Sequence, residues 1–113
     1  MGKIFLIIDS EIYSYEKIKF LCKNKKMRWT SHVMTRMIQR NISIDDVTHA
    51  ICTGTIIERY PTDYPYPSCL ILGIGENNQF LHVVCGLNND ELWLITAYAP
   101  SLDKWENDFQ KRR

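Results

Sequence analysis

The chain has 113 residues, of which 45% are hydrophobic and 24% charged, and its net charge is +1. This composition is typical of a globular protein, and the length supports one two-layer core, so we expect residues 1–113 to form a single domain. The opening MGKIFLIIDSE has only five consecutive apolar residues before Asp9. That run is too short for a secretory signal or for the roughly 20 residues of a membrane span. We therefore expect a cytoplasmic protein without membrane contact.

Basic residues are concentrated in the first part of the chain. Residues 1–40 carry nine Lys or Arg and three Asp or Glu, whereas residues 41–113 carry five and ten. Because a local patch sets the field that a polyanion meets, this asymmetry favours a face that binds phosphates. Lys25, Lys26 and Arg28 of the segment KNKKMR are candidate substrate contacts. The alternative is that KNKKMR is only a solvated connector.

The four cysteines do not form a metal-binding pattern. Cys22, Cys52, Cys69 and Cys85 are widely spaced, and none belongs to a C-x-x-C pair. Structural zinc sites usually contain at least one close pair of ligands, so buried thiols are favoured over a metal. We expect no metal and no other cofactor.

The first half of the chain predicts helices. Apolar residues recur at helical spacing over residues 12–22, while the short apolar run at residues 4–8 fits a strand or the start of that helix. Thr30 or Ser31 predicts the N-cap of a second helix, which ends near Asn41. A third helix is predicted to start after Ser43 and to end before Gly54.

The second half predicts strands. IIERY, SCLILGI, FLHVVCG and LWLITAY indicate four strands, and the short loops between them favour antiparallel pairing. In SLDKWENDFQ, apolar residues at helical spacing after Ser101 predict a C-terminal helix. The expected fold class is α+β: N-terminal helices packed on a four-stranded antiparallel sheet, with a short C-terminal helix.

The second predicted helix carries a cationic stripe. In SHVMTRMIQRNIS, His32, Arg36 and Arg40 are spaced by four residues. At roughly 100° per residue they lie within about 80° of one another, beside the apolar face, while the neutral Thr35 and Gln39 lie farthest from it. This position favours a stripe that reaches along the sheet surface. Two arginines that merely snorkel over apolar neighbours explain the pattern equally well.

The predicted strands supply two further candidates. Alternation places His82 on the face opposite Leu81, where a histidine is more often a hydrogen-bonded core residue than a catalyst. Tyr98 lies at the end of its strand, a common position for functional side chains, and alternation places it on the same face as Leu94. His49 lies across its helix from the apolar positions, so we expect it to be exposed and without a role.

If the helix stripe and the strand residues face each other, they suit metal-independent cleavage of RNA. A base removes the 2′-OH proton, the oxygen attacks the adjacent phosphorus, and an acid protonates the leaving oxygen. Histidine titrates near neutral pH and fills either role, whereas arginine offers planar contacts to phosphate oxygens. No glycine-rich phosphate loop, H-E-x-x-H or G-x-S-x-G motif competes with this assignment.

Several segments resemble the domain-of-unknown-function family numbered 4258. They are SHVMTRMIQRNISIDDVTHAI, IIERYPTDYPYPSCLILG, LHVVCG and LITAYAP, which match its H-x-x-x-R-x-x-x-R-G-I-S helix, E-Y strand, P-Y-P-like turn, H-V-V strand and T-A-Y strand. Asn41 stands where the family usually has glycine, a mild change because both residues accept a left-handed conformation. The resemblance defines a core at residues 29–110 and leaves residues 1–28 as a basic helical extension.

The resemblance implies a fold similar to that of the RelE-like toxin ribonucleases, with RNA as substrate and a cognate antitoxin protein as partner. It implies a site in which His32, His82 and Tyr98 are catalytic and Arg36 and Arg40 bind substrate. The leading hypothesis is therefore a metal-independent endoribonuclease of toxin type. The alternatives are a non-catalytic RNA-, nucleotide- or protein-binding module on the same fold and an enzyme acting on a small phosphorylated substrate.

Overall fold

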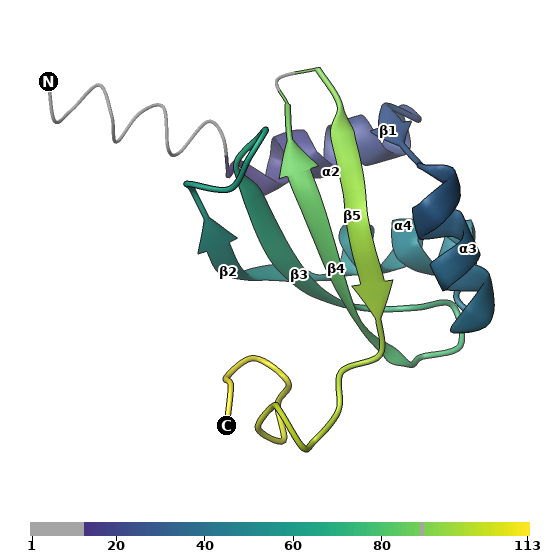
Figure 1. The fold of residues 1–113 in the computed structure, drawn as a ribbon, viewed down its shortest axis with the longest axis vertical. Helices are drawn as coiled ribbons and strands as arrows, with labels where there is room; N and C mark the ends of the chain where they lie inside the picture. The colour runs from purple at the N-terminus through teal and green to yellow at the C-terminus, as the bar shows by residue number, and fades with distance from the viewer. Residues whose placement is uncertain (1–12, 89) are drawn as a thin grey trace, which may run out of the picture.

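The computed structural model describes residues 13–88 and 90–113, and these form a mixed α+β fold (Figure 1). Three helices and a five-stranded, mostly antiparallel sheet make up this part of the chain. The elements are α2 (Tyr15–Lys23), β1 (Met27–Arg28), α3 (Ser31–Gln39), α4 (Ile44–Thr53), β2 (Thr55–Tyr60), β3 (Ser68–Ile74), β4 (Phe80–Leu87) and β5 (Leu92–Tyr98). None of the helices in these residues combines the length and the apolar character needed to cross a bilayer.

Local side-chain caps fix where the helices begin. The Thr30 hydroxyl accepts from the Val33 N–H at the start of α3, and Ser43 forms a reciprocal capping box with Asp46 at the start of α4. Asn41 adopts a φ of 57°, the left-handed exit predicted for α3. Both predicted helices are confirmed. The first helix begins at Tyr15, and the prediction for residues 4–8 lies outside the described residues.

The sheet has the strand order β1-β5-β4-β3-β2, and the four predicted strands pair antiparallel as expected. The predicted number of four strands is wrong, because β1 adds a fifth at the edge of β5. It pairs parallel to β5 through only two residues, Met27 with Leu92 and Arg28 with Trp93. A strand this short within a basic segment has no alternating pattern that sequence inspection detects.

The hydrophobic core lies between the sheet and the helices. Val47, Ala50 and Ile51 of α4 are fully buried, and Leu81 and Val83 of β4 face them. Figure 1 shows α2 and α4 on one side of the sheet and α3 beside β5. The opposite side, which we call the back face, carries no helix in the described residues, and this leaves its polar side chains for other contacts.

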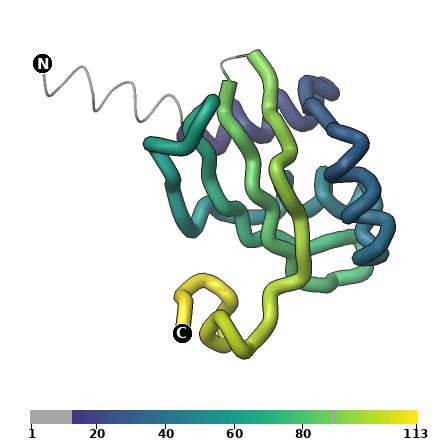
Figure 2. Tube along the Cα trace, in the orientation of Figure 1, coloured from purple at the N-terminus to yellow at the C-terminus, as the bar shows by residue number. Residues whose placement is uncertain are grey.

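The predicted C-terminal helix is wrong. Residues 101–113 form turns with a single bridge between Trp105 and Arg112. In Figure 2 this yellow segment turns back beside the lower end of the sheet. Trp105 is only 3% exposed, whereas Leu102 is 52% exposed, so the apolar residues do not share one buried face. Phe109 has a φ of 57°, which a continuous helix does not accommodate.

We predict that Gly73→Ala strongly destabilises the protein. A Cβ on Gly73 would overlap the backbone carbonyl of Ala50, because β3 crosses α4 at this point. Neither backbone can move without disturbing the core, so the free energy of unfolding should fall by more than about 3 kcal/mol in urea titrations. Gly86→Ala is the matched control, because its Cβ would lie 3.4 Å from the Trp93 Cβ. Equal stability of Gly73→Ala and wild type would contradict this packing.

Candidate functional site

Three predicted site residues line one groove between α3 and β5. His32, Arg36 and Arg40 of α3 face Ile95, Thr96 and Ala97 of β5 across a cavity of about 230 Å³. All three α3 side chains are exposed. The side chains of His32 and Arg36 have no hydrogen-bond or ion-pair partner among residues 13–88 and 90–113. The cationic stripe therefore borders the sheet, as its angular position predicts, and no carboxylate lines this α3–β5 groove.

Arg40 attaches the stripe to the edge of the sheet. Its Nη1 donates to Thr96 Oγ1 at 3.2 Å and to the backbone carbonyl of Ala97 at 3.0 Å. β1 pairs only with the first two residues of β5, so the carbonyl of Ala97 lies on an edge that β1 does not cover. An arginine with five N–H donors fills two bonds here and retains others for a ligand. The groove thus holds one oriented guanidinium and one unpaired guanidinium.

His82 is buried on the back face and hydrogen-bonded at both ring nitrogens. Its Nε2 lies 2.8 Å from the Phe109 carbonyl, and its Nδ1 lies 3.2 Å from the Tyr98 hydroxyl. A carbonyl only accepts, so Nε2 carries the proton and Nδ1 accepts from Tyr98. Trp105 packs edge-on against the imidazole with ring centroids 4.4 Å apart. These contacts are those of a hydrogen-bonded core histidine, and neither ring nitrogen is free for substrate.

Burial sets the protonation of this pair. It lowers the pKa of His82, and the bond to the Phe109 carbonyl and the charge of Glu58 only partly oppose that effect. Burial also raises the pKa of Tyr98, while the nearby charges of Arg112 and Arg40 lower it. At neutral pH the imidazole is therefore neutral and the phenol protonated. Tyr98 does not line the α3–β5 groove. It is half-buried and lies two residues after Thr96, the residue that binds Arg40, on the same face of β5.

The predicted face of Tyr98 is wrong, and a β-bulge explains why. Simple alternation places Tyr98 with Leu94, but the register with β4 shifts between Val84 and Cys85 and leaves Ile95 as an extra residue. Leu94 belongs to the core, whereas Tyr98 pairs with His82 on the back face. Alternation along β4 is confirmed, since Leu81 faces the core.

Sequence inspection missed a charged cluster that holds the C-terminal segment in place. Arg112 donates from Nε and Nη2 to the two Glu58 oxygens, each at 3.0 Å, and Tyr60 donates to Glu58 at 2.5 Å. The bond from Arg112 lowers the pKa of the Glu58 carboxyl. The Arg112 guanidinium also lies 4.7 Å from the Trp105 ring centroid. Arg112 and Glu58 are 54 residues apart, so no local sequence pattern predicts this ion pair.

The other predicted substrate-binding residues do not join the groove. Lys26 is exposed, and its backbone carbonyl accepts from the Leu92 N–H beside β1. Arg28 donates from Nε to Glu91 at 2.6 Å and lies 5.9 Å from the Trp93 ring centroid. Lys25 lines a separate cavity. Lys25 and Arg28 therefore lie in different regions, and neither lines the α3–β5 groove.

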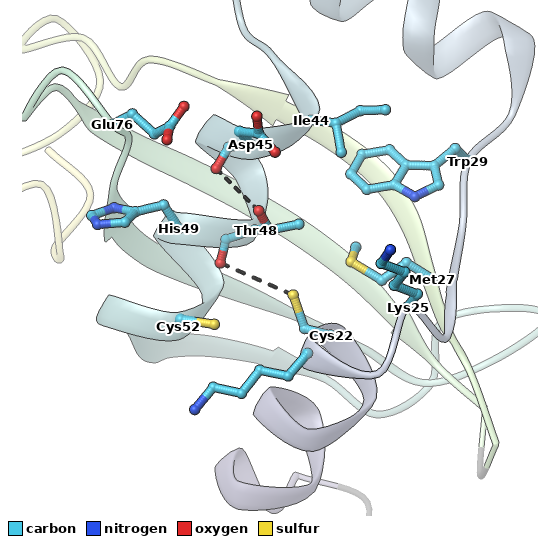
Figure 3. Close-up of a pocket in the computed structure, with 11 residues that line it drawn as sticks. Cys22, Lys25, Met27, Trp29, Ile44, Asp45, Thr48, His49, Cys52 and Glu76 are labelled. Atoms are coloured by element: carbon cyan, nitrogen blue, oxygen red, sulfur yellow. Dashed lines mark hydrogen bonds between the residues drawn. The ribbon is translucent and has the colours of Figure 1, made fainter.

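A larger cavity of about 680 Å³ lies between α2, α4 and the chain that leads to α3 (Figure 3). Cys22 and Cys52 lie at one side of it and Trp29 at another. Burial raises the pKa of Cys22 to about 12, so this thiol stays protonated. His49 is exposed as predicted, but its Nδ1 lies 2.6 Å from the Ile74 carbonyl. Within the described residues no group of three or more His, Cys, Asp or Glu is arranged to hold a metal ion.

A family model described as Domain of unknown function (DUF4258) matches residues 29–99. The chain belongs to this family. The matched region of this DUF4258 protein runs from α3 to β5 and contains His32, Arg36, Arg40, His82 and Tyr98, whereas α2, β1 and the C-terminal segment lie outside it. No curated protein and no solved structure matches the chain.

We predict that the burial of His82 makes stability depend on pH. The unfolded chain binds a proton at His82 near pH 6.5, the usual value, whereas the folded protein keeps it neutral to lower pH. The unfolded state therefore binds more protons, and the free energy of unfolding should fall as pH drops below about 6.5.

Urea titrations from about pH 7 to about pH 5.5 test this before most carboxylates titrate. His82→Gln should flatten the pH dependence, while the exposed-site control His32→Ala should retain it. The same slope in His82→Gln as in wild type would refute the assignment.

Proposed function

We propose that the protein is a metal-independent endoribonuclease of toxin type that acts on RNA in the cytoplasm and binds the RNA backbone in the α3–β5 groove. The observation that carries the proposal is the groove itself, in which His32, Arg36 and Arg40 share an open cavity without a carboxylate. Unpaired cations on a concave surface favour an anionic ligand. A phosphodiester matches both the charge and the hydrogen-bond acceptors that guanidiniums require.

The two arginines serve different purposes in this proposal. Arg40 is oriented by Thr96 and Ala97, so it presents its remaining N–H donors in a fixed direction. Arg36, one helical turn earlier, is free to follow the phosphate. Donors already aimed at the developing negative charge of the phosphorane-like transition state are worth several kcal/mol in enzymes generally. The α3–β5 groove supplies this without a metal.

Proton transfer falls to His32 and Tyr98. His32 is exposed in the groove and takes the proton from the 2′-OH, whose oxygen then forms a bond to phosphorus. Tyr98, protonated at neutral pH, turns its O–H from His82 Nδ1 to the leaving 5′-oxygen and gives it the proton as the P–O5′ bond breaks. The products are a 2′,3′-cyclic phosphate and a 5′-hydroxyl end, and solvent restores both side chains. His82 is then a positioning residue, which accepts from Tyr98 in the resting state and so orients its phenol.

The architecture also supports the proposed similarity to the RelE-like toxin ribonucleases, since helices flank one side of a mostly antiparallel sheet. A toxin of this type requires a cognate antitoxin protein. A partner that covers the groove would block RNA directly.

The second candidate is a non-catalytic RNA-binding module. It is favoured by the burial of His82, which is 0% exposed and has both ring nitrogens engaged. Only one exposed histidine, His32, then lies in the groove. Under this alternative the groove binds RNA with a salt dependence that reflects its phosphate contacts, and the RNA remains intact.

Incubation of the purified protein with total RNA in EDTA separates the two candidates. We predict cleavage by the wild type and a loss of about 100-fold or more in His32→Ala, the effect expected for removal of a general base. Arg36→Ala should weaken both cleavage and RNA binding. Lys17→Ala removes the same charge from α2, outside the groove, and should cleave like the wild type.

Three outcomes are informative. Intact RNA with salt-sensitive binding that requires Arg36 would favour the non-catalytic module. Equal cleavage by wild type and His32→Ala would exclude the proposed base. Neither cleavage nor binding would overturn both candidates.

A further inference from the structure

A second group of side chains lies on the back face at the start of β5. The rings of Tyr66 and Trp93 have centroids 6.0 Å apart and are tilted by 36°. The Arg28 guanidinium lies 5.9 Å from the Trp93 centroid. We call these three residues the Trp93 cluster. Tyr66 comes from the β2–β3 loop, Arg28 from β1 and Trp93 from β5, so the fold assembles the cluster from three distant segments.

Gly86 provides the floor of the Trp93 cluster. It pairs with Trp93 across β4 and β5, and a Cβ at this position would lie 3.4 Å from the Trp93 Cβ and 3.6 Å from the Ile95 Cδ1. The side chains of Trp93 and Ile95 therefore approach the same bare patch of sheet. Ile95 is 44% exposed and also lines the α3–β5 groove. The cluster and the groove form one continuous surface through Ile95.

The cluster is only partly buried, because Tyr66 and Trp93 are half-buried and Arg28 is exposed. The distance between the two rings is ordinary for an aromatic pair, whereas that between Arg28 and Trp93 is near the outer limit of a cation–π contact. The Trp93 indole N–H is covered by protein atoms, so a ligand does not contact it. The accessible parts of the cluster are the ring surfaces of Tyr66 and Trp93 and the exposed Arg28 guanidinium. These groups favour a planar ligand that stacks on them.

We propose that the Trp93 cluster is a base-binding subsite for single-stranded RNA, which extends the substrate-binding surface of the α3–β5 groove. This inference rests on the proposed RNA-binding function. An unpaired base stacks on the accessible surfaces of Tyr66 and Trp93, and Arg28, which donates from Nε to Glu91, packs on the base. Aromatic side chains and arginine planes are the groups that hold unstacked bases in single-stranded RNA.

The spacing fits a short stretch of one strand. Trp93 and Thr96, the residue that holds Arg40, are three positions apart on β5, or roughly 10 Å. A base on the cluster and a phosphate at Arg40 then belong to adjacent parts of one RNA strand. Duplex RNA does not fit, because its bases are stacked within the helix. The substrate class is therefore single-stranded RNA.

Binding of two uncleavable probes tests the subsite in the 113-residue protein. One is a short 2′-O-methyl RNA strand, and the other is an abasic phosphodiester strand of the same length and charge. The wild type should prefer the strand with bases by at least about fivefold, a contribution typical of one stacked base. Trp93→Leu should lose this preference, and so should Tyr66→Leu, which leaves the buried part of β5 intact. Trp29→Phe, an aromatic change beside the larger cavity, should keep it.

The outcomes separate the inference from the proposed function. If the wild type binds neither strand, the proposed RNA-binding function fails and the subsite fails with it. If the wild type prefers the strand with bases but folded Tyr66→Leu and Trp93→Leu keep the same preference, only the subsite is overturned. Tighter binding of duplex than of single-stranded RNA would also overturn it. Arg36→Ala should weaken both probes equally, since it acts on phosphates alone.

Discussion

The hydrogen bonds from Arg40 to β5 fix the position of α3 against the sheet, and the candidate site depends on this contact. They join α3 to the uncovered edge of the sheet at Thr96 and Ala97. Because β1 ends two residues into its pairing with β5, that edge is available to a side chain. The β-bulge at Ile95 then turns Tyr98 to the back face, where it pairs with His82. The short β1 thus leaves the edge of β5 open to the cationic stripe of α3, and the extra residue Ile95 turns Tyr98 toward His82. The stripe and the His82–Tyr98 pair therefore lie on two sides of β5.

The back face depends on the C-terminal segment. Without a helix over it, His82 would meet water, but Trp105 and the Phe109 carbonyl cover the imidazole and fix its tautomer. The ion pair of Arg112 with Glu58 ties this cover to β2. Exposed ion pairs contribute little to stability, so Trp105 provides most of the attachment and the bidentate pair fixes its direction. The result is a neutral histidine that orients a tyrosine.

Local chemistry made much of this fold predictable. The caps at Thr30 and Ser43 and the four alternating strands are encoded by neighbouring residues, so the sequence located them well. The angular position of His32 and Arg36 also predicted a stripe at the border of the core. Features that depend on distant partners were not predictable. β1 exists because β5 lies beside it, and the bulge at Ile95 reflects pairing with β4. The segment around Trp105 has a helical pattern, but it is bound as irregular chain because Trp105 alone fits against His82.

The central claim is that RNA binds at the α3–β5 groove and not in the larger cavity beside α4. The ring resonances of the three histidines distinguish these locations, since His32 lines the groove, His49 lines the larger cavity and His82 is buried. Titration with uncleavable 2′-O-methyl RNA, followed by nuclear magnetic resonance, should move the His32 resonances progressively and leave those of His49 in place. Movement of His49 with no change at His32 would contradict the account.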